Sequence, residues 1–147
     1  MGANTDSPQL LPQPYLPLKI IPNHQSPITN HRSPLTDCLM TLTSLILLTY
    51  NNLHYTRQCL DSILVHTPLN QIEIIVVDNA SQDDTPHYLQ KLAGVYPQIH
   101  PILNATNLGF SAGINLGAAN ARGEYLVFLN NDVIVTEGWL SGLLAHL

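Results

Sequence analysis

The amino-acid sequence predicts a three-layer α/β/α sandwich with a mostly parallel sheet, and two observations lead to this fold class. From about residue 41, short apolar runs alternate with stretches whose apolar residues recur at helical spacing. Several of these runs are nearly continuous, which is typical of strands that helices cover on both faces of a parallel sheet. The predicted order is β-α-β-α-β-α-β, with right-handed crossovers between the strands.

Four apolar runs are predicted to form the strands of this sheet. The first, second and fourth are the near-continuous ones, and the third is weaker. They occupy residues 43–50, 73–77, 100–104 and 124–130.

Amphipathic stretches between the runs predict the helices. After the polar residues 51–52, apolar side chains recur at helical spacing up to residue 64, so this helix is expected to pack on the sheet. Thr85 is a suitable N-cap for a second helix, because Pro86 then falls in the first turn, where a missing N–H costs nothing. This helix is expected to run to about residue 93, with Gly94 ending it.

The segment GFSAGINLGAANA predicts a third helix. Its larger apolar residues fall on one side: Phe110, Ile114, Ala118 and Ala121. Glycines recur every four residues and give a smooth ridge that another backbone or a ligand could approach closely: Gly109, Gly113 and Gly117. A last apolar stripe, from Trp139 to Leu147, predicts a fourth helix and exposed hydrophobic surface at this end.

The first part of the chain has a different composition. Seven of the eleven prolines lie between Pro8 and Pro34, where no hydrophobic period is present. Proline removes the backbone donors that helices and sheets need. We therefore expect a Pro-rich irregular tail over residues 1–40 and a partial α/β domain over residues 41–147.

Charge and cysteine content exclude several classes of protein. Five Lys and Arg against ten Asp and Glu give a formal charge of −5 and no basic cluster, so nucleic acid is not an expected partner. The two cysteines, Cys38 and Cys59, stand alone and fit a reducing cytoplasm. No apolar run reaches the roughly 18 to 20 residues of a transmembrane segment.

Polar clusters follow three of the predicted strands, at residues 49–52, 78–81 and 130–132. Each cluster alone is explained equally well as a turn, a loop cap or a solvated connection. Ligands of parallel sheets, however, bind at the carboxyl ends of the strands, where the strand order reverses. Convergence of three polar clusters on one edge therefore favours a binding site.

The glycine-rich phosphate loops of nucleotide-binding proteins are absent from the first strand end. A dinucleotide site has GxGxxG there and a P-loop has GxxxxGK[ST], whereas this chain has T-Y-N-N. A divalent cation, Mg²⁺ or Mn²⁺, held by Asp132 could bind a diphosphate instead, because these cations prefer hard oxygen ligands.

Four motifs in this order resemble the nucleotide-binding half of family-two glycosyltransferases, which have the GT-A fold with a Rossmann-like sheet. The motifs are LILLTYNN, IIVVDNASQDDT, NLGFSAGINLG and ARGEYLVFLNND, and the resemblance covers residues 43–147. Within the family they look most like the rhamnosyltransferase branch. The resemblance implies transfer of a sugar from a UDP- or dTDP-linked donor, with inversion, in the biosynthesis of cell-surface polysaccharide.

The resemblance also implies roles for individual residues. Three residues of the first strand end would line the base and ribose pocket: Thr49, Tyr50 and Asn51. Asp78 would hydrogen-bond the uracil or thymine ring, and three residues would lie beneath the nucleotide: Asn107, Gly109 and Asn115. The D-x-D signature of the family falls on Asn130, Asn131 and Asp132, so Asp132 would bind the metal that bridges the diphosphate.

The sequence departs from the family pattern at two positions and lacks one role. Asn130 replaces the first acid of D-x-D, and Ile114 stands where many relatives have Arg or Lys. The general base of inverting members lies well downstream of D-x-D, so we expect it beyond residue 147 and assign no residue of this chain, including Glu137 and His146, to that role. The chain is accordingly expected to be inactive alone.

Three functions are compatible with this sequence. The first is the donor-binding region of a glycosyltransferase acting on a saccharide or lipid-linked acceptor, in the cytoplasm or at the inner face of the cell membrane. The second is a non-catalytic nucleotide-binding remnant or interaction module with the same fold. A sugar nucleotidyltransferase is the third, but its Gly-rich basic loop is missing after the first strand.

Overall fold

The computed structural model describes residues 19–22 and 41–146 of the chain. In this described part the strands are β1 (Lys19–Pro22), β2 (Thr43–Thr49), β3 (Ile72–Asp78), β4 (Ile99–Leu103) and β5 (Tyr125–Asn130). The helices are α1 (Leu53–His66), α2 (Thr85–Ala93), α3 (Gly109–Ala119) and α4 (Trp139–Leu144), with a short 3₁₀ turn, η1 (Leu69–Gln71). Cys38 and Leu147 lie outside the described residues.

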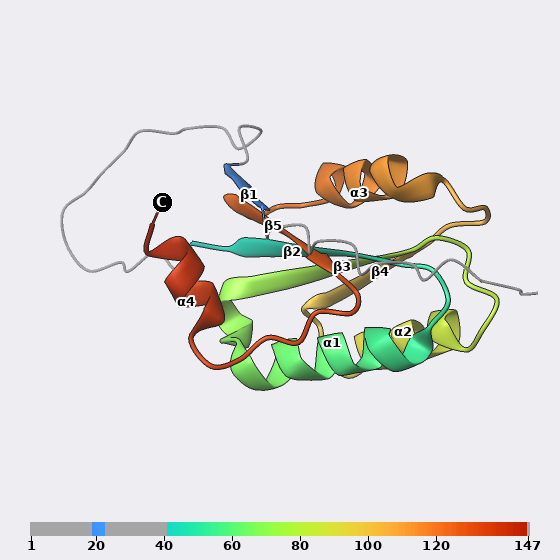
Figure 1. Ribbon diagram of the computed structural model, residues 1–147, viewed down its shortest axis with the longest axis horizontal. Coiled ribbons are helices and arrows are strands. Elements are labelled where there is room, and N and C mark those ends of the chain that lie inside the picture. Colours follow the sequence, from blue (N-terminus) through green and yellow to red (C-terminus); the bar gives the residue numbers. More distant parts are fainter. Residues whose placement is uncertain (1–18, 23–40, 147) are drawn as a thin grey trace, which may run out of the picture.

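The strands form one sheet in the order β1-β5-β2-β3-β4. Strands β2 to β5 are mutually parallel, whereas β1 is antiparallel to β5. Helices α1 and α2 cover one face and α3 covers the other, as Figure 1 shows. The predicted α/β/α sandwich with a mostly parallel sheet is therefore confirmed.

The strands are buried because helices cover both faces of the sheet, as the apolar runs of the sequence indicated. Every residue of β3 is buried, because the sheet is covered on both faces. Alternate residues point to opposite sides, so Leu45 and Leu47 join the core cluster with α1, whereas Ile46 lies beneath α3. At about 25 cal/mol per Å² of buried apolar surface, these strands supply much of the stability of the domain.

Helix α3 packs on the sheet through its glycines. A Cβ atom at Gly113 would lie 2.4 Å from Leu48 Cδ1, and one at Gly117 would lie 2.6 Å from Ile46 Cγ2. The predicted ridge of glycines is thus the part of α3 that contacts the sheet, at Gly113 and Gly117. Phe110, one of the apolar residues noted in the sequence, lies in the first turn of α3 and is 58% exposed.

Two local expectations are corrected by the structure. Thr85 is the first residue of α2 and not its cap; the cap position belongs to Asp84, and the Thr85 N–H is held by Asp83 Oδ1 at 3.0 Å. Residues 19–22, expected to be irregular, form β1 along the outer edge of β5. Pro22 is tolerated there because an edge strand has one side without a ladder partner.

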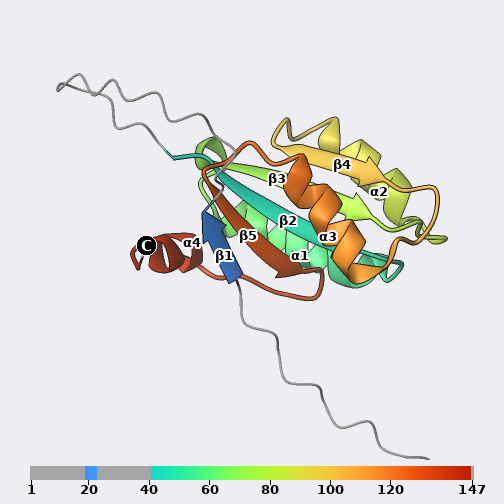
Figure 2. The same ribbon diagram turned by 90° about the horizontal axis from the view of Figure 1, so that it is seen from above.

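Helix α4 lies beside the amino-terminal ends of β2 and β3, as Figures 1 and 2 show. Leu140 of the predicted apolar stripe is buried, and the half-buried Trp139 donates its indole N–H to Thr67 Oγ1 at 2.9 Å. The stripe therefore packs against the end of α1. Among the described residues, no helix is both long and apolar enough to span a membrane.

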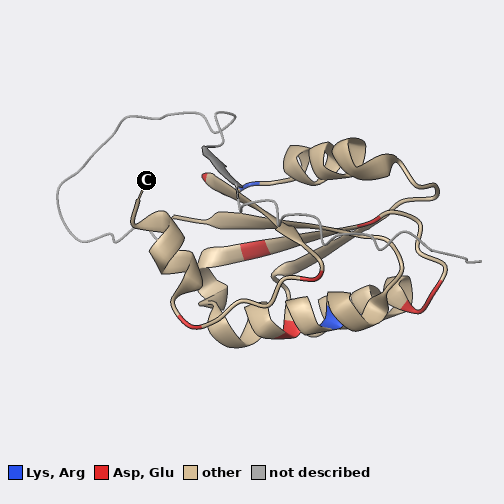
Figure 3. Ribbon diagram, viewed as in Figure 1, with Lys and Arg blue, Asp and Glu red and all other residues tan. Residues whose placement is uncertain are grey.

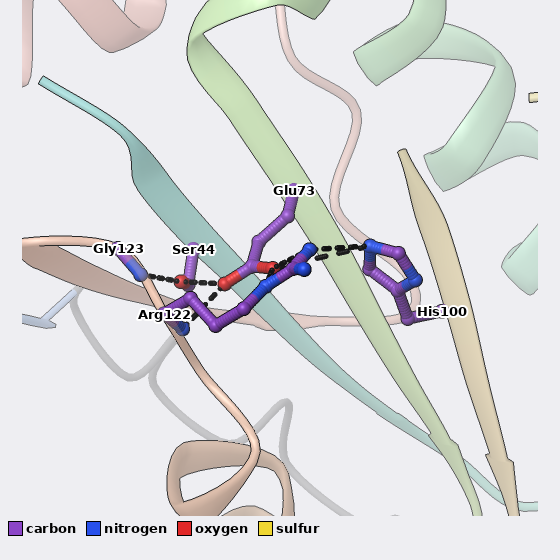
Figure 4. Close-up of polar contacts among 5 residues, drawn as sticks. All are labelled: Ser44, Glu73, His100, Arg122 and Gly123. Atoms are coloured by element: carbon purple, nitrogen blue, oxygen red, sulfur yellow. Dashed lines mark hydrogen bonds and ion pairs between the residues drawn. The ribbon is translucent and has the colours of Figure 1, made fainter. Parts of the chain in front are cut away.

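An ion pair between the buried Glu73 and the largely exposed Arg122 joins β3 to the loop before β5, and Figure 4 shows it with its neighbours Ser44 on β2 and His100 on β4. Glu73 is 2% exposed and accepts hydrogen bonds from Ser44 Oγ at 2.6 Å, from the Arg122 backbone N–H at 2.6 Å and from Arg122 Nε at 2.8 Å. Burial alone would raise the pKa of Glu73, but these hydrogen bonds and the Arg122 charge outweigh it and hold that pKa below its ordinary value. The sequence analysis did not identify this pair.

Candidate functional site

The sheet brings the three predicted polar clusters to one edge. Thr49 is level with Asp78 in the β2–β3 register, and Leu48 is level with Asn130 in the β2–β5 register. The strand order reverses at β2, because β3 and β4 follow on one side and β5 returns on the other. The carboxyl ends of β2, β3 and β5 therefore flank the switch point where sheets of this kind bind ligands.

Asp78 is the most deeply placed acidic residue at this edge. It is 1% exposed, and its Oδ2 accepts the Ser81 backbone N–H at 3.0 Å. Its Oδ1 is buried and has no hydrogen-bond partner among the described residues. An unpartnered carboxylate oxygen is costly, so this atom is a good acceptor for a ligand N–H.

The loops after β2 and β3 are hydrogen-bonded to each other. Asn51, in the left-handed conformation with φ of 55°, donates its backbone N–H to Ser81 Oγ at 2.6 Å. Its side-chain oxygen accepts the Gln82 N–H at 2.7 Å. Tyr50 is 46% exposed beside these loops. Of the residues expected to line a base and ribose pocket, Tyr50 is thus accessible, whereas the Asn51 side chain holds the loop.

Thr49 and Asn131 are joined within the protein and do not project into open space. Thr49 is 1% exposed and its Oγ1 lies 2.7 Å from Thr56 Oγ1. Asn131 Nδ2 donates to Thr56 Oγ1 at 3.1 Å and to Thr49 Oγ1 at 3.4 Å. Their hydrogen-bonding groups are therefore used to connect the end of β2, α1 and the loop after β5.

Asp132 and Asn130 are both exposed at the end of β5. Within the described residues, no group of three His, Cys, Asp or Glu side chains could hold a metal ion. A single carboxylate nevertheless suits Mg²⁺ or Mn²⁺ when phosphate oxygens and water complete the coordination. Burial, and secondly the negative charge of Asp132, raise the pKa of Cys59 to about 12, and so the thiol stays protonated beside this loop.

An asparagine network that the sequence analysis missed shapes the start of α3. The buried Asn79 donates to Asn107 Oδ1 at 2.8 Å and accepts from the Leu108 N–H at 2.9 Å. Asn107 Oδ1 also accepts the N–H of Gly109, whose φ of +77° suits only glycine well. Asn107 and Gly109 thus lie next to the end of β3. Asn104 joins the network by donating to Asn79 Oδ1 at 3.2 Å, and three asparagines in loops gave no periodic signal that would have indicated it.

Asn115 is not brought to this edge. It is exposed on α3, two residues from each of the glycines that face the sheet, and hence on the opposite side of the helix. Figure 3 shows acidic residues in the loops at the strand-end edge and little Lys or Arg. An anionic ligand there would depend on a cation or on backbone N–H groups.

An open groove of about 980 Å³ lies elsewhere, between the end of α1 and α4. Glu137 lines it, together with His66 and Leu140. The groove is at the amino-terminal side of the sheet, whereas the polar strand ends are at the carboxyl side, so it is not part of the candidate site.

Known structures share this fold. TarS from S. aureus superposes with a TM-score of 0.64 at 26% identity, over 71% of this chain and 31% of that one. The mannosyltransferase PcManGT from Pyrobaculum calidifontis superposes with a TM-score of 0.57 at 28% identity, over 64% of this chain and 28% of that one.

Sequence comparison gives the same result. An uncharacterized glycosyltransferase of Haemophilus influenzae is 31% identical over 106 residues, which are 72% of this chain and 32% of that protein. The chain therefore spans about a third of the length of this curated relative. The family model described as Glycosyl transferase family 2 matches residues 44–147, and the chain belongs to this family.

Proposed function

We propose that residues 41–147 are the donor-binding region of a glycosyltransferase that takes a nucleoside diphosphate sugar, with UDP or dTDP as the nucleotide. The carrying observation is the buried Asp78 Oδ1, which lacks a partner and lies level with the end of β2. Uracil and thymine both present a ring N–H that this oxygen could accept. TarS in complex with UDP and with UDP-GlcNAc supports a uridine donor.

The proposed divalent cation is Mg²⁺ or Mn²⁺, and Asp132 is its protein ligand. PcManGT in complex with GDP-Man and Mn²⁺ supports a cation at a site of this kind. Negative charge grows on the diphosphate as the bond to the anomeric carbon breaks, and the bound cation supplies charge that stabilises the transition state more than the ground state. Asn130 offers a neutral amide oxygen beside Asp132, and we assign it to the ribose or diphosphate.

The remaining residues have supporting roles in this proposal. Tyr50 offers its exposed ring to the base, and the loop that Asn51 holds forms the wall beside it. Asn107 and Gly109 shape the backbone below the nucleotide through their hydrogen bonds with Asn79. Thr49 and Asn131 contribute through the position of the backbone, because their side chains bond within the protein.

Sugar transfer itself is proposed for a larger protein. Because the chain spans about a third of the length of its relatives, we place the general base, the acceptor site and inversion in the part of such an enzyme that these residues do not include. We also propose that the donor carries rhamnose and that the acceptor is a saccharide or is linked to a lipid. The enzyme would then serve cell-surface polysaccharide synthesis at the inner face of the membrane.

Calorimetry with UDP or dTDP, with and without Mn²⁺, tests the donor site. Asp78→Asn and Asp132→Asn keep the side-chain shape and are expected to weaken binding about tenfold to a hundredfold, as a lost bond to a charged group would. Asp84→Asn is the matched control, because Asp84 is exposed and makes no side-chain cap bond. The proposal is refuted if the parent binds neither nucleotide, or if Asp78→Asn and Asp132→Asn bind as tightly as Asp84→Asn.

A further inference from the structure

The loop that carries Asp132 is fastened to α1 at three points. Asn131 Nδ2 donates to Thr56 Oγ1 at 3.1 Å, at the start of the loop. Cys59 Sγ donates to the backbone oxygen of Asn130 at 3.6 Å. Further along, the Val135 N–H donates to Ser62 Oγ at 3.1 Å. Residues 130–135 are thereby held on both sides of Asp132.

The three anchoring residues form one row along α1. Thr56, Cys59 and Ser62 recur every third position, so they follow one another on the same side of the helix. Thr56 and Cys59 are fully buried, which limits the access of water to their side of the hydrogen bonds. The Thr56 hydroxyl is itself fixed by Thr49 Oγ1 at 2.7 Å, which connects the row to the end of β2.

Asp132 depends on this row because its own carboxylate is not held directly. It is exposed, and among the described residues no side chain hydrogen-bonds it. The position of its Cα and the direction of its Cα–Cβ bond are consequently set by the backbone of residues 130–135, which the row holds. Residues that orient a metal ligand typically affect metal affinity by about tenfold to a hundredfold.

We propose that the row Thr56, Cys59 and Ser62 positions the Asp132 carboxylate for a divalent cation, with Thr56 acting through Asn131 as the main positioning residue. This inference rests on the proposed donor site. The row would hold the loop in place before ligands bind: it does not touch the cation or the nucleotide, and it limits the positions that the Asp132 carboxylate can reach to those near the end of β5.

Mn²⁺ binding in the presence of UDP, followed by electron paramagnetic resonance on the full chain, tests the inference. Thr56→Val keeps the side-chain shape and removes the hydroxyl; it is expected to weaken Mn²⁺ binding about tenfold or more. Thr56→Ser restores the hydroxyl and is expected to bind close to the parent. Thr43→Val is the matched control, since the Thr43 hydroxyl is buried without a hydrogen-bond partner among the described residues.

A second variant covers the case in which Thr56→Val fails to fold. Ser62→Ala, at a half-buried position, removes the bond to Val135 and is expected to weaken Mn²⁺ binding and to speed hydrogen exchange of the Val135 amide. If the parent binds Mn²⁺ with UDP and the Thr56 and Ser62 variants bind equally well, the positioning role is overturned while the donor site stands. If the parent itself does not bind Mn²⁺ with UDP, the proposed function fails and the positioning role with it.

Discussion

Replacement of the buried Glu73 by glutamine tests how much the hydrogen bonds of its carboxylate, which connect the sheet to the loop before β5, contribute to stability. The carboxylate accepts at both oxygens: Oε1 from Ser44 Oγ and the Arg122 backbone N–H, and Oε2 from Arg122 Nε. Glutamine has one oxygen, so either amide orientation sets an NH₂ group against an N–H of Arg122. The substitution therefore loses bonds and adds a conflict between donors.

The expected loss of stability follows from these contacts. Two hydrogen bonds to a charged group are worth about 1.5 to 3 kcal/mol each. The Arg122 side chain is 67% exposed, so solvent screens its share of the ion pair and that share is discounted. We expect Glu73→Gln to lower the free energy of unfolding by about 2 to 4 kcal/mol at pH 7.

The loss is expected to depend on pH in one direction. Because the folded state holds the pKa of Glu73 below its ordinary value, the carboxylate contributes its full stabilisation above the unfolded glutamate pKa of about 4.3. This contribution disappears as the pH falls through the lower folded pKa, where Glu73 becomes as neutral as glutamine. The difference between the parent and Glu73→Gln is therefore largest at neutral pH and shrinks below about pH 4.

Urea denaturation between pH 3 and pH 7 measures both effects. A loss of 2 to 4 kcal/mol would lower the urea midpoint at pH 7 by about 1 to 3 M. Glu124→Gln is the control, because Glu124 is exposed, and it is expected to change little. The reasoning is refuted if Glu73→Gln matches Glu124→Gln at pH 7, or if its deficit is the same at pH 3 as at pH 7.

Two further predictions concern the helices. Gly117→Ala places a Cβ 2.6 Å from Ile46 Cγ2 and is expected to lower the free energy of unfolding by about 1 to 3 kcal/mol. Gly142→Ala meets no atom within 4 Å and is expected to raise that free energy by up to about 1 kcal/mol. Thermal unfolding measures both, and equal melting temperatures of the two variants would contradict the prediction. Cys59 is fully buried with its pKa raised to about 12, so iodoacetamide at pH 8 is expected to modify it only after unfolding. Mass spectrometry that finds Cys59 alkylated in the native protein within minutes would disprove its protection.

The layers and the parallel strands could be predicted because their signal is local. The runs that became β2, β3 and β5 are nearly continuous in apolar residues, which is typical of strands buried on both faces. Strand β1 gave no such signal, since it is four residues long and lies among prolines. Its partner, β5, begins more than a hundred positions later, and no local pattern encodes that pairing.

The candidate site was predictable only in outline. Its place at the strand ends followed from the order of the elements, and the register of β2 with β3 and β5 agrees with it. What each polar side chain contacts could not be derived, because the partners are distant in sequence. Asn131 illustrates this: it occupies a motif position, yet its amide bonds with Thr56, which lies 75 positions earlier.

The close packing of α3 on the sheet could be predicted from its glycines. Their regular spacing indicated a ridge that another backbone could approach. In the structure Gly113 and Gly117 leave no room for a Cβ against Leu48 and Ile46. Which strand residues the ridge meets could not be derived, because they are distant in sequence.

The hydrogen bonds between the loops after β2 and β3 lower the conformational entropy that these loops would lose when a ligand binds. Asn51 and Ser81, thirty positions apart, hold each other, and Asn51 keeps a left-handed conformation that free asparagine adopts only part of the time. Ordering a loop residue costs about 1 to 2 kcal/mol of conformational entropy. A nucleotide entering beside Asp78 would meet a main chain in which much of that entropy is already lost. Even a small fragment, such as uridine alone, is expected to bind measurably at this edge.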